Sequence, residues 1–114
     1  MTVLLSDEEI ATIVERVVWV ARPERVLMFG SYAKGRAHAR SDLDLLVVMP
    51  TGTPDPPRPS DFTPYLGGGA VRVDVHVVTE EELSEYGRQE HHFLHSVLRT
   101  GRTLYPPAAA GSRR

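Results

Sequence analysis

The sequence predicts a single α/β (α+β) domain in which helices flank a small mixed sheet of about three to four strands. Three observations support this prediction: a capped helical pattern near the N-terminus, three short runs of apolar and β-branched residues, and a second helical pattern in the C-terminal third. A chain of 114 residues is large enough for one hydrophobic core and too small for two. Hydrophobic residues at 41% and charged residues at 25% are typical of a globular domain.

The first expected element is a helix that runs from Ser6 to about Ala21. Ser6 and Glu9, three residues apart, form a capping box, and Pro23 forces the helix to stop nearby. Apolar side chains recur at helical spacing and so form one stripe: Ile10, Ile13, Val14, Val17 and Ala21. Trp19 lies on the opposite, polar face, where it either covers a neighbouring loop or anchors a partner protein.

Three strands are expected in the middle of the chain. The stretch "RVLMFGS" predicts a short buried strand that breaks at Gly30, and "YAKGRA" after it offers one helical turn. A second strand follows in "DLDLLVVM" and a third in "VRVDVHVV". The third strand alternates strictly, so that it has a valine face and a polar face formed by Arg72, Asp74 and His76.

Thr79 and Glu82 form another capping box, and we expect a second helix from there to Gly101. Its apolar residues are Leu83, Tyr86, Leu94, Val97 and Leu98. Residues 50–69 hold six of the nine prolines and end in "GGG", which predicts a loop or mobile flap. The prediction is therefore one domain over residues 1–107, containing this loop, and a flexible tail over 108–114.

Composition excludes several classes of function. The formal charge is −2, from 13 basic and 15 acidic side chains, so the chain lacks the net positive charge that binding to extended nucleic acid requires. The absence of cysteine excludes disulfides and thiolate metal sites, and it fits a reducing compartment. The start "MTVLLSDEEI" resembles neither a signal peptide nor a membrane span, so we expect a cytoplasmic protein without membrane contact.

Three carboxylates are the strongest candidates for chemistry. Asp42 and Asp44 are two residues apart on a strand, so both project to one face, where a divalent cation such as Mg²⁺ would remove their repulsion. Asp74 lies mid-strand among valines, where strand propensity disfavours it. If the two strands are neighbours, the three carboxylates can converge on one or two ions, an arrangement that supports phosphoryl-type transfer. The alternatives are a solvated strand start for the first two and a solvent-facing position for Asp74.

Gly30 and Ser31 supply the second half of the predicted site. A glycine at a strand end allows close approach of a ligand, and the N–H groups of a turn that opens into a helical start favour anions. This pair would hold the polyphosphate of a nucleotide whose metal lies on the carboxylates. Lys34 and Arg36 add positive charge nearby or are ordinary surface charges. The combination indicates metal-assisted nucleotidyl transfer.

The histidines near the C-terminus raise the alternative of a zinc site. His91 and His95 are one helical turn apart, and His92 lies between them. No acidic or third well-spaced ligand accompanies them, so we interpret them as surface or interface histidines.

The pattern Gly30-Ser31, ten residues, Asp42-x-Asp44 and a later strand Asp74 resembles the DNA polymerase beta-like nucleotidyltransferase superfamily. Within it, the short chain and "LMFGSYAKGRAHARSDLDLLVV" are similar to the minimal nucleotidyltransferases, the MNT group. The resemblance is close over residues 24–49 and weaker at Asp74 and "LRTGRTLY". It implies the small nucleotidyltransferase core fold and ATP as substrate. It also implies that Asp42 and Asp44 bind two magnesium ions, and that Asp74 binds one of them and helps to activate the acceptor hydroxyl.

The resemblance also implies a partner. MNT proteins are commonly antitoxins of HEPN-domain ribonuclease toxins, and some of them transfer AMP from ATP to a toxin tyrosine. Larger relatives such as aminoglycoside-modifying enzymes carry an added helical domain that binds the acceptor, for which this chain has no room, so we expect another molecule to bring the acceptor. Relatives also carry a helical stretch between the second and third strands, where this chain has its Pro/Gly-rich segment.

Three functions remain open at this point. The first is protein adenylylation by an antitoxin, and the second is a catalytically degenerate module that neutralises a toxin by contact alone. The third is nucleotidyl transfer to a small molecule or an RNA end.

Overall fold

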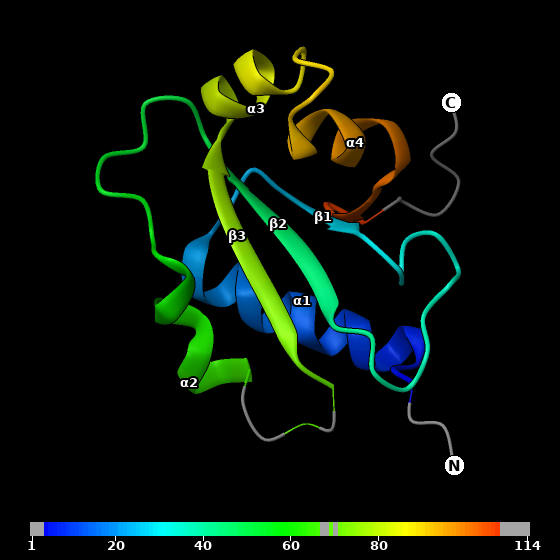
Figure 1. The fold of residues 1–114 in the computed structure, drawn as a ribbon. Helices are drawn as coiled ribbons and strands as arrows, with labels where there is room; N and C mark the ends of the chain where they lie inside the picture. The colour runs from blue at the N-terminus through cyan, green and yellow to red at the C-terminus, as the bar shows by residue number, and fades with distance from the viewer. Residues whose placement is uncertain (1–3, 67–68, 70, 108–114) are drawn as a thin grey trace.

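The computed structural model describes residues 4–66, 69 and 71–107, and its core is one four-stranded mixed sheet (Figure 1). The strands lie in the order β3-β2-β1-β4, and their bounds are β1 Arg25–Phe29, β2 Leu43–Met49, β3 Val73–Thr79 and β4 Arg102–Tyr105. β1 is antiparallel to both β2 and β4, whereas β2 and β3 are parallel. This arrangement confirms the predicted α/β (α+β) class and the three expected strands.

Helices cover both faces of the sheet. α1 (Asp7–Ala21) packs on one face, against the apolar side chains at odd-numbered positions of β2. α3 (Glu80–Tyr86) and α4 (Phe93–Thr100) pack on the other face, where Leu46 and Val48 meet their buried side chains. β2 is therefore buried on both faces, which explains its nearly continuous apolar run. Asp44 belongs to the same row as Leu46 and Val48 but is only partly buried, so it lies where the helical cover ends.

The first helix forms as predicted. Ser6 and Glu9 make both hydrogen bonds of the capping box, and the helix ends at Ala21 with Arg22 in a left-handed conformation before Pro23. Three residues of the apolar stripe are fully buried: Ile10, Val14 and Val17. Trp19 is mostly exposed, with the Arg22 guanidinium 5.9 Å from its ring centre.

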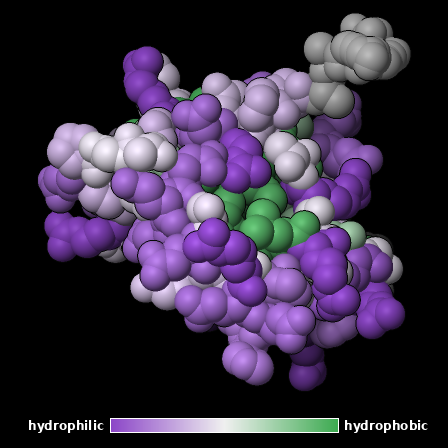
Figure 2. All heavy atoms as spheres, turned by 90° about the horizontal axis from the view of Figure 1, so that it is seen from above, coloured by the Kyte–Doolittle hydropathy of each residue, from purple (hydrophilic) through white to green (hydrophobic). Residues whose placement is uncertain are grey.

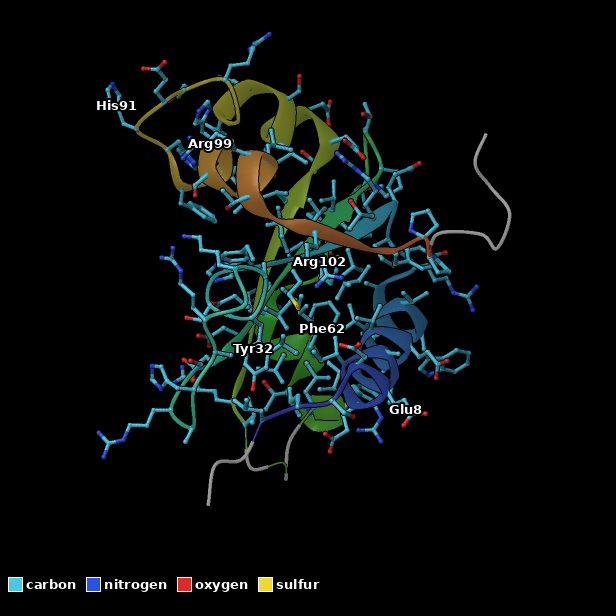
Figure 3. The ribbon with its side chains drawn as sticks, turned by 90° about the vertical axis from the view of Figure 1, so that its right-hand side faces the viewer. Glu8, Tyr32, Phe62, His91, Arg99 and Arg102 are labelled. Atoms are coloured by element: carbon cyan, nitrogen blue, oxygen red, sulfur yellow. The ribbon has the colours of Figure 1, made fainter. Side chains whose placement is uncertain are left out.

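The prediction of a loop or flap over residues 50–69 is wrong for its second half. Residues Pro59–Phe62 form a 3₁₀ helix, η1, and Thr63–Leu66 form the short helix α2, against α1 and β3. Proline suits the first position of a helical turn, and Phe62 is buried in the core on the α1 side of the sheet (Figure 3). The helical stretch expected of relatives is thus present between the second and third strands. Part of the "GGG" run and the predicted tail over 108–114 lie outside the described residues.

The predicted second helix is two helices. α3 ends at Tyr86, and α4 begins at Phe93 after a reversal of the chain. A Cβ at Gly87 would overlap both Leu98 and the carbonyl oxygen of Leu83, so the glycine lets Leu98 of α4 pack closely against the end of α3. The Thr79–Glu82 capping box at the start of α3 is present as predicted.

Two further segments are the stretch after β1 and the C-terminal strand. The stretch "YAKGRA" lies in successive turns: the hydrogen bond from Lys34 N to Gly30 O (3.1 Å) has the spacing of one helical turn, and Arg36 N donates to Ser31 O (2.9 Å). β4 was not expected as a strand. It pairs with β1 at the edge of the sheet. Its first two residues are exposed and its last two are partly buried, so its apolar and polar residues do not alternate as they do in β3.

The surface is polar around a few exposed apolar side chains. Seen from above, the molecule is mostly hydrophilic with one apolar patch near the centre (Figure 2). Within the described residues, three of the six exposed large hydrophobic side chains belong to α3 or α4: Tyr86, Phe93 and Leu98. No helix in this part of the chain combines the length and apolar character that crossing a membrane requires.

The packing of the 59–66 segment can be tested with a pair of neighbouring aromatic residues. Phe62 is 1% exposed and Tyr65 is 47% exposed. We expect Phe62→Ala to lower the free energy of unfolding by about 3–5 kcal/mol, because it leaves a cavity in the core. Tyr65→Ala should change it by less than about 0.5 kcal/mol. Urea denaturation measures both, and Phe62→Leu provides a milder variant if the alanine variant does not fold. Equal effects of the two alanine variants would show that the segment is not packed.

Candidate active site

Asp44 and Asp74 lie side by side on neighbouring strands. The parallel register of β2 and β3 pairs Asp44 with Asp74, and the antiparallel register of β1 and β2 pairs Phe29 with Asp44. A hydrogen bond from Leu43 N to Arg72 O (2.9 Å) continues the pairing towards the N-terminal end of β2. The condition under which the carboxylates could converge, that their two strands are neighbours, is therefore met.

Asp42 precedes β2 by one residue and is positioned by the loop before it. Ser41 is the buried polar residue of this loop. Its hydroxyl accepts a hydrogen bond from His38 N (2.9 Å), and its own N–H donates to His38 O (2.9 Å). The loop thus closes immediately before Asp42. Sequence reasoning missed Ser41, although serine in a turn commonly bonds to nearby backbone in this way.

Gly30 lies directly beneath the Asp44 carboxylate. Its φ is +76°, in the left-handed region that favours glycine, and an added Cβ would overlap the carboxylate of Asp44. The sequence predicted a close approach of a ligand to this glycine. The structure shows that the approaching group is a carboxylate of the site itself.

The turn after Gly30 presents the other predicted residues. Ser31 is partly buried, whereas Lys34 and Arg36 are exposed on the same turn. Tyr32 anchors the turn to the start of the chain, because its hydroxyl accepts a hydrogen bond from Leu5 N (3.2 Å; Tyr32 is labelled in Figure 3). The turn therefore places a hydroxyl group and two basic side chains next to the strand end.

The carboxylates concentrate negative charge that is only partly compensated. Burial raises the pKa of Asp44 above its usual value, the neighbouring Asp74 and Asp42 carboxylates raise it further, and His76 acts in the opposite direction. Asp74 forms an ion pair with Arg72, in which Nε lies 3.2 Å from Oδ1. A guanidinium thus balances part of the charge that the strand pairing concentrates.

These residues fit a hard divalent cation. Within the described residues, no three His, Cys, Asp or Glu side chains are already grouped to hold an ion, and Asp74 is turned towards Arg72. The donor set is nevertheless carboxylate oxygen, which magnesium prefers. Burial is the main reason that the pKa of Asp44 is raised, and the neighbouring Asp74 and Asp42 carboxylates add a repulsion that a cation would remove. Asp42, Asp44 and Asp74 are the residues that would hold it.

The C-terminal histidines have structural contacts. Nδ1 of His92 accepts a hydrogen bond from Leu94 N (3.1 Å) and so caps α4, while Nδ1 of His95 lies 3.0 Å from Gly87 O. His91 is exposed and projects away from the domain (Figure 3). Sequence reasoning did not single out His76 as a site residue, yet it lies on the same strand face as Asp74, and its ring centre is 5.4 Å from that of Phe29.

The comparison with protein families identifies the family of this chain. A family model described as a nucleotidyltransferase domain matches residues 9–100, a range that includes every predicted site residue. Among solved structures, a Sulfolobus solfataricus protein assigned as a nucleotidyltransferase is 29% identical, with a TM-score of 0.48. That match covers 67% of this chain and 68% of the other. No curated protein matches the sequence.

The raised pKa of Asp44 predicts how stability depends on pH. An acid whose pKa is higher in the folded state stabilises the fold below its unfolded pKa, and this contribution is lost as pH rises through the folded value. Asp44→Asn cannot ionise, so it does not lose this contribution. We expect the free energy of unfolding of the variant to rise relative to wild type as the pH increases from about 4, near the ordinary aspartate pKa, to about 7. Urea denaturation across this range, without divalent cations, measures the difference. A difference that does not grow with pH would contradict the prediction.

The contact between Gly30 and Asp44 can be separated from backbone strain with two glycines. Gly30 and Gly52 have almost the same φ, +76° and +77°, but a Cβ on Gly52 would meet no atom within 4 Å. Gly52→Ala should therefore report left-handed strain alone, about 1–2 kcal/mol. We expect Gly30→Ala to cost about 1–3 kcal/mol more, because it must displace the Asp44 carboxylate. Equal losses in urea denaturation would show that Asp44 moves without cost.

Proposed function

The chain belongs to the nucleotidyltransferase domain family, and on this premise we propose that it is a magnesium-dependent enzyme that transfers AMP from ATP to a partner protein. The observation that carries the proposal is the pairing of Asp44 with Asp74, with Asp42 at the head of the same strand and the Gly30–Ser31 turn beside them. Carboxylates and a phosphate-binding turn are the two parts that nucleotidyl transfer requires.

Each part of the site has a role in the proposal. Asp42, Asp44 and Asp74 hold magnesium, which when bound supplies positive charge to the phosphates. The Ser31 hydroxyl and the exposed Lys34 and Arg36 side chains interact with the polyphosphate. Arg72 must release Asp74 when the cation enters, because both compete for the same carboxylate.

The acceptor approaches from the outer edge of the sheet. β3 is an edge strand, so Asp74 lies at the rim of the site, where a hydroxyl group on another molecule can reach it. The acceptor oxygen forms a bond to the α-phosphorus while the bond from that phosphorus to the pyrophosphate oxygen breaks. The hydroxyl proton passes to the Asp74 carboxylate, and pyrophosphate leaves.

The proposed acceptor is a tyrosine of a HEPN-domain toxin, which would make this chain the antitoxin. The resemblance to the MNT group supports this partner. The exposed side chains Tyr86, Phe93 and Leu98 offer apolar contact area on α3 and α4, the helices that pack on the Asp44 face of the sheet. One observation favours the alternative of a binding module that acts by contact alone. Asp74 is ion-paired with Arg72, and the described carboxylates are not grouped to hold an ion.

Co-expression with a HEPN-domain toxin, sought in the reading frame adjacent to that of this chain, separates transfer from binding. We expect intact mass spectrometry to show AMP on the toxin with wild type and none with Asp42→Ala/Asp44→Ala. Asp74→Asn should slow transfer by about 100- to 10,000-fold, the usual effect of losing a general base. His91→Gln, which alters an outward-pointing residue, is the matched control and should behave like wild type.

The same experiment decides between the two functions. Growth of the cells reports whether the toxin is silenced. Loss of protection by the double variant, together with loss of the AMP mass, supports the enzyme. Full protection by the double variant, with an unmodified toxin in every case, would establish the binding module instead.

A further inference from the structure

Five aromatic side chains form one connected cluster on the face of the sheet that carries the carboxylates. Three of them meet around the end of β1: the ring centres of Phe29 and His76 are 5.4 Å apart, those of Phe29 and Phe93 are 6.1 Å apart, and those of His76 and Phe93 are 5.7 Å apart. His92 and Tyr86 extend the cluster from Phe93 along the α3–α4 turn. The proposed reaction does not use any of these rings.

Part of the cluster is a stack. His92 lies against Phe93 with centres 5.2 Å apart and planes inclined by 26°, and Tyr86 lies against His92 at 5.0 Å and 23°. Phe93 is 46% exposed although it contacts three other rings. A phenyl ring held in place by a stack, with nearly half its surface in water, offers area on which another planar ring can stack.

The cluster adjoins the carboxylates directly. Phe29 is the register partner of Asp44, and it immediately precedes Gly30, where the phosphate-binding turn begins. His76 follows Asp74 on the same face of β3. A nucleotide whose phosphates lie at the turn therefore has its planar base within the neighbourhood of these rings.

We propose that Phe93, supported by Phe29 and His76, is the platform on which the base of the donor nucleotide stacks. This inference rests on the proposed function, because it says where the base of the same donor nucleotide binds. Stacking is the contact that a phenyl ring provides, and it tolerates every base because each has a π-face. The platform therefore adds affinity for a nucleotide over a bare polyphosphate, while it discriminates little between adenine and guanine.

Calorimetry with two ligands isolates the base from the phosphates. ATP and inorganic tripolyphosphate, each with magnesium, are titrated into wild type, Phe93→Ala, Phe93→Trp and Tyr65→Ala. Removal of a stacking aromatic typically costs about 5- to 150-fold in affinity. We expect this loss for ATP binding to Phe93→Ala, no change for tripolyphosphate, and retained ATP affinity in Phe93→Trp. Tyr65→Ala, with a similarly exposed aromatic ring on α2, should bind both ligands like wild type.

Other outcomes overturn the platform in distinguishable ways. If wild type binds ATP and tripolyphosphate equally, or if Phe93→Ala weakens both ligands by the same factor, the base does not stack on Phe93 and the proposed function stands. If wild type binds neither ligand with magnesium, the platform and the proposed function fail together. Folding of each variant is checked by its urea midpoint. Phe93→Ala should lower the midpoint modestly, because more than half of the ring is covered and it contacts three other rings, and should leave the variant folded.

Discussion

The parallel pairing of β2 with β3 is the constraint on which the site depends. It places Asp44 beside Asp74, which is unfavourable for two like charges on neighbouring strands. The pairing persists because β2 is buried on both faces, by α1 on one and by α3 and α4 on the other. If the register of β2 slipped by one residue, the side chain of Asp44 would point into the core under α1, and those of Leu43 and Leu45 would point out of it. The hydrophobic pattern of β2 therefore holds the carboxylates together against their repulsion.

The rest of the site adapts to that repulsion. Gly30 leaves room for the Asp44 carboxylate at the end of β1, and Arg72 supplies a positive charge to Asp74. Because the Arg72 side chain is largely exposed, solvent screens this ion pair and it contributes little stability. A divalent cation would therefore displace Arg72 at small cost. The charge arrangement that destabilises the strand pairing also leaves the site suited to a cation.

Local signals predicted the parts of the molecule that local chemistry determines. The Ser6–Glu9 box and apolar stripe predicted α1, and the strict alternation of β3 predicted its two faces. Long-range contacts determine the parts that the sequence did not predict. The 59–66 helices depend on the burial of Phe62 in the core on the α1 side of the sheet, and the turn between α3 and α4 brings Leu98 against Gly87. β4 forms through its pairing with β1, and its own residues do not show the alternation of apolar and polar side chains that predicts a strand. The roles of the site residues stay predictions, whereas the neighbouring positions of Asp44 and Asp74 are observed.

The position of the exposed aromatic rings connects contact with chemistry. Phe93 and Tyr86 belong to the helical layer on the same side of the sheet as the carboxylates, and Phe29 and His76 join them to Asp44 and Asp74. A partner that covers this layer also covers the approach to the phosphates, so it would exclude water from the reacting groups. Under the proposed function, docking and transfer would therefore use adjoining surfaces of one small domain. A chain of this family that lost its carboxylates would still present the aromatic rings to a partner. The carboxylates, rather than the aromatic rings, therefore distinguish an enzyme from a module that acts by binding alone.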